Sequence, residues 1–116
     1  MNNINPIYHN EFGVAFQLKR SSAADRHKIQ LVFRNTGLLL TYSELKQFCS
    51  SVAETIDTSK LCGKCSKDKD CKSLLLQTPI DQLSFAMSMV ELLSLEELIQ
   101  GTLFQLELDQ LLYRND

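Results

Sequence analysis

Two stretches of the sequence carry the same order of signals, and this order restricts the fold more than any other feature. Residues 31–56 and 74–103 each begin with an apolar run that ends in a turn signal, Asn-Thr-Gly at 35–37 and Thr-Pro at 78–79. A second short run, a helix-capping pattern and an amphipathic segment follow in both. Each stretch therefore predicts strand, turn, strand, cap and helix, and the second turn is the longer one.

A capping box opens each predicted helix. Thr41 and Glu44 form the first box, and Ser88 and Glu91 form the second. In each box a hydroxyl and a carboxylate satisfy two backbone N–H groups that the helix leaves without partners. Such a cap stabilises a helix by about 1 kcal/mol. Apolar residues flank both boxes in the positions of a hydrophobic staple: Leu40 with Leu45, and Met87 with Leu92.

The similarity continues along the two helices at a constant offset of 47 residues. One apolar face follows each cap with the spacing i, i+3, i+7, i+11 of a buried helical stripe. The matched residues are Leu45, Phe48, Val52 and Ile56 in the first stretch and Leu92, Leu95, Ile99 and Leu103 in the second. We interpret the stretches as a pseudo-repeat of two units, too few for a solenoid. The alternative is a chance similarity of two generic amphipathic units.

Two apolar runs nearer the N-terminus alternate with other residues and complete the sheet. The alternating apolar sets are Val14, Phe16 and Leu18 in the first run, and Ile29, Leu31 and Phe33 in the second. Such alternation indicates antiparallel strands with one buried face. We therefore predict an α+β fold, with an antiparallel sheet of about five strands and two helices packed on one face.

The length of 116 residues is that of one domain. We divide residues 1–116 into a first hairpin–helix unit with an extra N-terminal strand (12–58), a cysteine- and lysine-rich loop (59–71) and a second ββα unit (72–116). No apolar run reaches the roughly 18 residues of a membrane span, and the first ten residues lack the pattern of a signal peptide. We expect the protein in the cytoplasm, where thiols stay reduced.

Charge is unevenly distributed along the chain, whose net charge is −2. From Ile80 onward seven acidic residues face one base, Arg114, which gives −6, whereas residues 1–79 carry +4. A solvated acidic helix face explains this distribution, and a surface that docks a partner is the alternative. The pattern argues against nucleic-acid binding, which calls for a basic domain with interleaved aromatic residues.

The apolar stripe of the last helix is broader than a small two-layer domain can cover. Beside the core positions stands a second set: Leu93, Phe104, Leu108, Leu111 and Leu112. One interpretation is that the helix bends near Gly101 and wraps its own core. The other is that the second set forms a homodimer seam, because exposed apolar patches of this kind usually mark interfaces.

Three cysteines, Cys62, Cys65 and Cys71, follow one another in the order C-x2-C-x5-C. Two thiolates at C-x2-C spacing can bind one tetrahedral zinc ion, and Gly63 permits the tight turn between them. Five lysines surround the cysteines and favour the thiolate form: Lys60, Lys64, Lys67, Lys69 and Lys72. A fourth ligand is not obvious, and the candidates are His27, Cys49, His9, Asp70 or water. Cys49 lies on the apolar face of the first helix, where core packing explains it better.

Other interpretations of this loop stay open. Reduced thiols without a metal explain it as well as zinc does. The CGKC segment also has the spacing of a thioredoxin-type redox pair, but such a pair lies at a helix N-terminus after a strand, whereas this one follows a helix. An iron–sulfur cluster would call for four cysteines in a suitable frame. A further hypothesis is that the lysines dock an acidic partner or a phosphate backbone.

The sequence contains none of the common catalytic motifs, such as GxSxG, a P-loop, GxGxxG or HExxH. Glu96 and Glu97 are consecutive helix positions, so their carboxylates diverge and indicate a solvated face. We therefore predict a non-enzymatic interaction or structural protein with a structural zinc site at Cys62, Cys65 and Cys71. The alternative is a thiol redox protein or sensor that uses Cys62 and Cys65.

Overall fold

The computed structural model describes residues 4–18, 28–62 and 74–113. In these ranges the strands are β1 (Ile4–His9), β2 (Gly13–Leu18), β3 (Ile29–Phe33), β4 (Thr36–Leu40), β5 (Leu74–Gln77) and β6 (Ser84–Met87), and the helices are α1 (Tyr42–Cys62) and α2 (Met89–Tyr113). Strands β1 to β4 form an antiparallel sheet in chain order, and β5 pairs with β6 alone. The α+β prediction is confirmed, but the described strands form two sheets instead of one sheet of about five strands.

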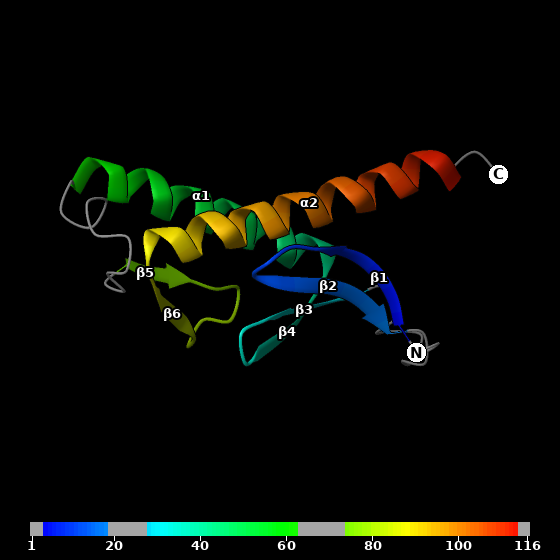
Figure 1. Ribbon diagram of the computed structural model, residues 1–116, viewed down its shortest axis with the longest axis horizontal. Coiled ribbons are helices and arrows are strands. Elements are labelled where there is room, and N and C mark those ends of the chain that lie inside the picture. The colour runs from blue at the N-terminus through cyan, green and yellow to red at the C-terminus, as the bar shows by residue number, and fades with distance from the viewer. Residues whose placement is uncertain (1–3, 19–27, 63–73, 114–116) are drawn as a thin grey trace.

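Both helices lie on the same side of the strands (Figure 1). Helix α2 packs on β1 and β2, whereas α1 packs on β4 and β5 and along α2. Strands β5 and β6 form a separate two-stranded sheet. Each helix nevertheless covers strands from the other half of the chain, so the two halves share one core.

The local patterns in the two hairpin–helix units are confirmed. In both capping boxes the hydroxyl and the carboxylate make the expected bonds, at 2.9–3.1 Å for Thr41 and Glu44 and 3.0–3.2 Å for Ser88 and Glu91. The predicted helix faces are buried, except for Leu103, which is partly buried against the core. The turn is shorter in the first hairpin (34–35) than in the second (78–83). The element order thus occurs twice, while a symmetry relation between the units stays a prediction.

The inward face of β2 differs from the prediction, whereas that of β3 is as expected. Ile29, Leu31 and Phe33 are buried in β3. In β2 the fully buried residue is Ala15, and the set predicted to face inward is only half-buried or exposed: Val14, Phe16 and Leu18. At Gly13 an added Cβ would lie 2.2 Å from the Val32 carbonyl oxygen of β3 and 3.1 Å from Cδ2 of Leu98 in α2. The neighbouring strand and the helix thus leave room only for a small residue there.

Strand β1 was not predicted from the sequence. It pairs with β2 at the edge of the sheet and is irregular between Pro6 and Tyr8. Proline is tolerated there because an edge strand leaves some N–H groups unpaired. The Tyr8 ring packs directly on the backbone of α2 at Gly101, where an added Cβ would overlap ring atoms. This contact explains a glycine in the middle of a continuous helix.

We predict that Gly101→Ala destabilises the fold by about 1–3 kcal/mol, because the methyl group displaces the Tyr8 ring. In an ordinary helix interior the same change would stabilise by about 1 kcal/mol. Urea unfolding of G101A, Y8A and the double variant measures the coupling between the two positions. In the Y8A background G101A should be neutral or stabilising. A gain in stability from G101A in both backgrounds would contradict the contact.

Candidate functional site

The predicted zinc ligands lie at the end of α1 and beyond it. Helix α1 ends at Cys62, so residues 59–62 are helical instead of belonging to the loop assigned from the sequence. The other two predicted ligands and two candidate fourth ligands lie outside the described residues: Cys65, Cys71, His27 and Asp70. The zinc site at Cys62, Cys65 and Cys71 therefore stays a prediction.

The described candidates for the fourth ligand are Cys49 and His9. Cys49 and Cys62 stand thirteen positions apart on one continuous helix, a distance of about 20 Å. Zinc–sulfur bonds are about 2.3 Å long, so the two thiols cannot share one ion. Burial, and next the charge of Glu96, raises the pKa of the Cys49 thiol, which packs against the core. His9 is exposed at the end of β1.

Within the described residues no group of three histidine, cysteine or acidic side chains is arranged to hold a metal ion. The position of Cys62 also bears on the redox alternative. It lies in the last turn of α1, where the helix dipole places partial negative charge. Thioredoxin-type cysteines lie instead at a helix N-terminus.

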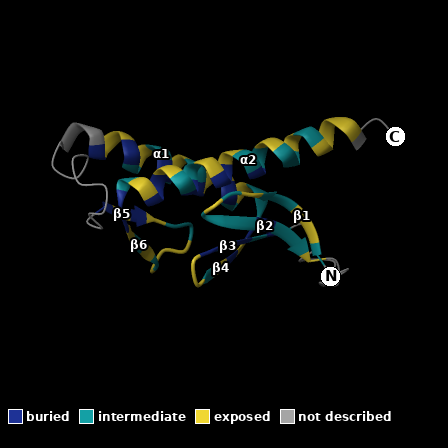
Figure 2. Ribbon diagram, in the orientation of Figure 1, coloured by how far each residue is buried: buried dark blue, intermediate teal, exposed yellow. Residues whose placement is uncertain are grey.

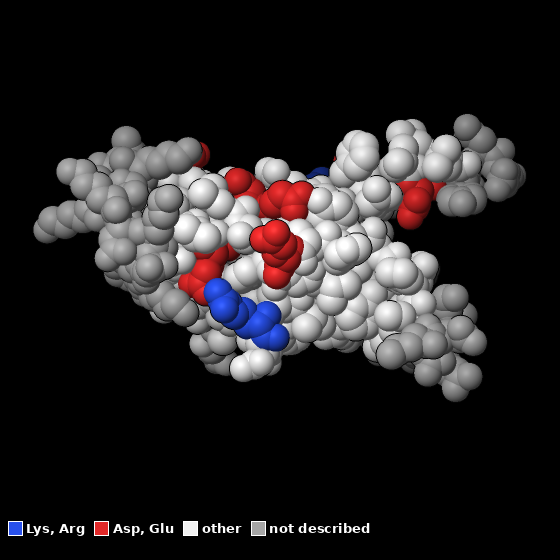
Figure 3. All heavy atoms as spheres, viewed as in Figure 1, with Lys and Arg blue, Asp and Glu red and all other residues white. Residues whose placement is uncertain are grey.

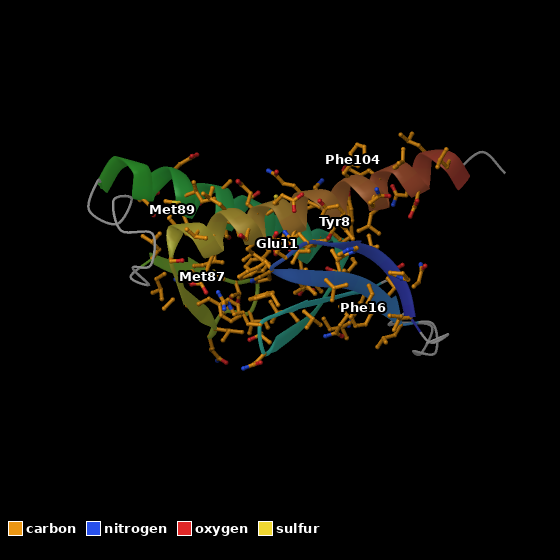
Figure 4. The ribbon with its side chains drawn as sticks, viewed as in Figure 1. Tyr8, Glu11, Phe16, Met87, Met89 and Phe104 are labelled. Atoms are coloured by element: carbon orange, nitrogen blue, oxygen red, sulfur yellow. The ribbon has the colours of Figure 1, made fainter. Side chains whose placement is uncertain are left out.

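Helix α2 carries a row of exposed apolar side chains. Leu93 is 47% exposed, Phe104 62% and Leu111 68%. Successive helix residues are rotated by about 100°, so residues 11 or 7 positions apart point in nearly the same direction. The three side chains therefore form one line along the helix. Phe104 points away from the strands (Figure 4). We call Leu93, Phe104 and Leu111 the α2 ridge.

The distal end of α2 extends past the strands that lie beneath the helix (Figures 1 and 2). Leu106 is the last described residue of α2 that packs against the core, and residues 109–112 are all exposed. In the second apolar set predicted from the sequence, Leu108 is partly buried and the other four are exposed: Leu93, Phe104, Leu111 and Leu112. The helix therefore does not wrap its own core with this set.

Carboxylates are held in place on both sides of the α2 ridge. On the β1 side, Glu97 accepts hydrogen bonds from the Tyr8 hydroxyl and, at 2.8 Å, from Nδ2 of Asn10. Asn10 is itself fixed, because Nδ2 also donates to the Ser94 carbonyl at 2.9 Å. On the α1 side, Glu107 accepts a bond of 3.2 Å from the Tyr42 hydroxyl.

These bonds change the acidity of the partners. The hydrogen bonds from Tyr8 and then Asn10 lower the pKa of Glu97, and burial opposes them slightly. The Tyr8 pKa is raised, mainly by the same bond to Glu97. Burial, followed by the Glu107 charge, raises the pKa of Tyr42. At neutral pH the Glu97 carboxylate beside the ridge is therefore ionised, and the Tyr8 and Tyr42 phenols are neutral.

The charge on α2 is of one sign. Between Met89 and Tyr113 there are five acidic residues and no lysine or arginine: Glu91, Glu96, Glu97, Glu107 and Asp109. On the face drawn in Figure 3, acidic side chains gather along this helix. The acidic bias predicted from the sequence thus accompanies an exposed apolar row on the same element.

A hollow of about 380 Å³ between α1 and β5 is lined by several hydroxyl groups. The Thr55 hydroxyl donates to the Ser51 carbonyl at 2.8 Å, and the Ser59 hydroxyl donates to the Thr55 carbonyl at 2.7 Å. The described lining holds no histidine or lysine that could activate them. Its described acidic residue is Glu54.

Comparison with protein-family models, with curated proteins and with solved structures gave no match. Among the described residues, no helix is both long and apolar enough to cross a membrane.

Sequence reasoning missed the contacts that fix Glu97. It treated Glu97 as a solvated charge, and the side chain is indeed exposed, but Tyr8 and Asn10 determine its position. These residues are 89 and 87 positions away, so no local pattern joins them to Glu97. Asn10 and Gly13 give only a turn signal, which indicates a hairpin and not its partner.

We predict that Glu97→Gln reduces the loss of stability in acid. The folded-state pKa of Glu97 is lowered from its ordinary value of 4.5. As the pH falls below about that value, the unfolded chain therefore binds a proton at Glu97 more readily than the folded chain does. The contact therefore stabilises the fold above that pH and is lost as the pH falls through the folded-state pKa. Thermal unfolding between pH 6 and pH 2.5 should show a steeper decline for the wild type than for E97Q. Glu96→Gln is the control, and equal slopes for wild type and E97Q would contradict the assignment.

Proposed function

We propose that this chain is a cytoplasmic, non-enzymatic interaction domain that docks a polypeptide partner on the α2 ridge. The observation that carries the proposal is the exposure of Phe104 and Leu111 on a helix that continues past its own core. Single exposed apolar residues are common, but a row of them aligned on one helix face is typical of an interface. The homodimer expected from the sequence is one form of this proposal.

The described side chains support a structural over a catalytic role. In the hollow between α1 and β5, the Thr55 and Ser59 hydroxyl groups bond to the backbone of their own helix, and the Cys49 thiol is partly buried with a raised pKa. We also propose that the two hairpin–helix units are a pseudo-repeat. The matched element order and the identical bonding of the two capping boxes support this relation.

The docking proposal predicts a contact at position 104 in the cell. A photoreactive phenylalanine analogue in place of Phe104 should give a discrete cross-linked product on irradiation, because its side chain points into the interface. The matched control carries the analogue at Leu39, which is 44% exposed on β4. A mass of two chains would identify a second copy, and a different mass another protein. No product, or the same products from both positions, would contradict the proposal.

We further propose that zinc pins the loop after α1 through Cys62, Cys65 and Cys71. Cys62 ends a regular helix, so one ligand would have a fixed starting point. The partial negative charge at the helix C-terminus favours a cation there. When bound, zinc would join these thiolates in a tetrahedral structural site. The alternative is a thiol redox protein or sensor that uses Cys62 and Cys65, and reduced thiols without metal are the remaining interpretation.

Elemental analysis tests the zinc proposal. Protein purified without chelator or affinity metal should contain about one zinc per chain, with three thiols protected from alkylation. Cys65→Ser should lose the metal, whereas Cys49→Ser should keep it, because Cys49 lies about 20 Å along α1 from Cys62. Metal-free protein with freely reactive thiols would overturn the proposal. One thiol that reacts far faster than the others would favour the redox alternative.

A further inference from the structure

We infer that the partner of the α2 ridge is a basic amphipathic helix of another protein and not a second copy of this chain. The inference rests on the proposed docking function and names the chemistry of the partner. It follows from the position of the carboxylates beside the ridge and from the symmetry that a homodimer would impose.

The carboxylates beside the ridge are positioned for cationic side chains. Glu97 is held on one side by Tyr8 and Asn10, and Glu107 on the other by Tyr42. Both side chains are exposed, and the helix that carries them has no lysine or arginine between Met89 and Tyr113. A partner with an apolar stripe bordered by lysine or arginine would place its charges against these fixed carboxylates. Charge complementarity of this kind selects the partner and accelerates association.

A second copy that used the whole ridge would meet like charges. A two-fold axis pairs antiparallel helices residue by residue. The register that places Leu93 opposite Leu111 of the second copy also places Glu97 opposite Glu107, and symmetry repeats this clash. Two further registers pair different ridge residues: Leu93 opposite Phe104, which places Glu97 opposite Gln100, and Phe104 opposite Leu111. They use only about three and two turns of each helix, which is short for the roughly 800 Å² per partner of a stable interface.

The ridge sets the length of the partner. Leu93 and Leu111 stand eighteen positions apart on a continuous helix, which is about 27 Å. A partner helix of about 18 residues therefore covers the ridge from end to end. Glu97 and Gln100 lie between Leu93 and Phe104, so apolar contacts would gather at the two ends. This pattern matches helix-in-groove recognition, in which spaced apolar anchors fix the position of the partner.

The test uses the full chain and three synthetic 18-residue peptides labelled for fluorescence anisotropy. The first has leucine on one helical face and lysine elsewhere, the second replaces lysine by glutamate, and the third scrambles the first. We expect the amphipathic lysine peptide to bind at least about tenfold more tightly than the other two, and more weakly as salt is raised. Equal binding of the scrambled peptide, preference for the glutamate peptide, or no binding to any peptide would overturn the inference.

Variants of the protein locate the binding. The double variant F104S/L111S should weaken binding of the lysine peptide by about tenfold or more, because apolar anchors dominate such interfaces. The variant E97Q/E107Q keeps the ridge and should weaken binding several-fold with a smaller salt dependence. Leu39→Ser should bind as the wild type does, and thermal unfolding confirms that each variant is folded. Unchanged binding by F104S/L111S would overturn the inference.

The cross-linking experiment at position 104 distinguishes two outcomes: that the partner is not a basic helix, and that the α2 ridge docks no partner at all. A cross-link to another protein, combined with peptide binding that does not depend on charge, would overturn only the inference that the partner is basic. A product with the mass of two chains would also overturn it, while the docking surface would stand. Absence of a product would overturn the docking function itself.

Discussion

The carboxylate of Glu91 joins the two halves of the fold. One oxygen accepts a bond from the Ser88 backbone and completes the cap of α2, and the other contacts Nη2 of Arg34 at 2.5 Å. Glu91 is only 7% exposed. A buried carboxylate is costly unless it is both bonded and paired, and here its partners come from separate hairpin–helix units. The start of α2 is therefore fixed relative to the β3–β4 hairpin, and the position of the whole helix follows.

Arg34 has a backbone conformation that is unusual for a residue other than glycine. It occupies the turn between β3 and β4 with φ of 55°, a region that non-glycine residues enter at a cost of about 1–3 kcal/mol. The ion pair with Glu91 offsets this cost, as does the position of the guanidinium 5.4 Å from the centre of the Phe12 ring. Phe12 stacks on Phe33, which in turn meets the edge of Phe85 in β6. Arg34 thus connects the β1–β2 turn, the β3–β4 hairpin and the second sheet.

Features that depend on residues close together in the sequence were predicted correctly. The capping boxes, the buried helix faces and the alternation of β3 depend on residues a few positions apart, and all were found. The missed features depend on contacts between distant segments. Ala15 is the buried residue of β2, on which α2 packs, and β1 is fixed by Tyr8 on Gly101 and by Asn10 with Glu97. The second apolar set of α2 was identified from its position around the helix axis. That position does not specify which molecule covers it. The predicted zinc ligands beyond Cys62 lie outside the described residues, so their geometry remains untested.

The distal end of α2 is not explained by the stability of this domain. Contacts at Glu91 and Gly101 fix the first part of the helix, and Leu106 is its last described contact with the core. Among the described residues beyond Leu106, none belongs to the buried core, Leu108 is partly buried, and Glu107 bonds to Tyr42. The residues beyond Leu106 expose Leu111 and Leu112 to water, which favours association over solubility. In the docking proposal, these exposed leucines and the neighbouring carboxylates of Glu107 and Asp109 are what a cationic, apolar partner would contact.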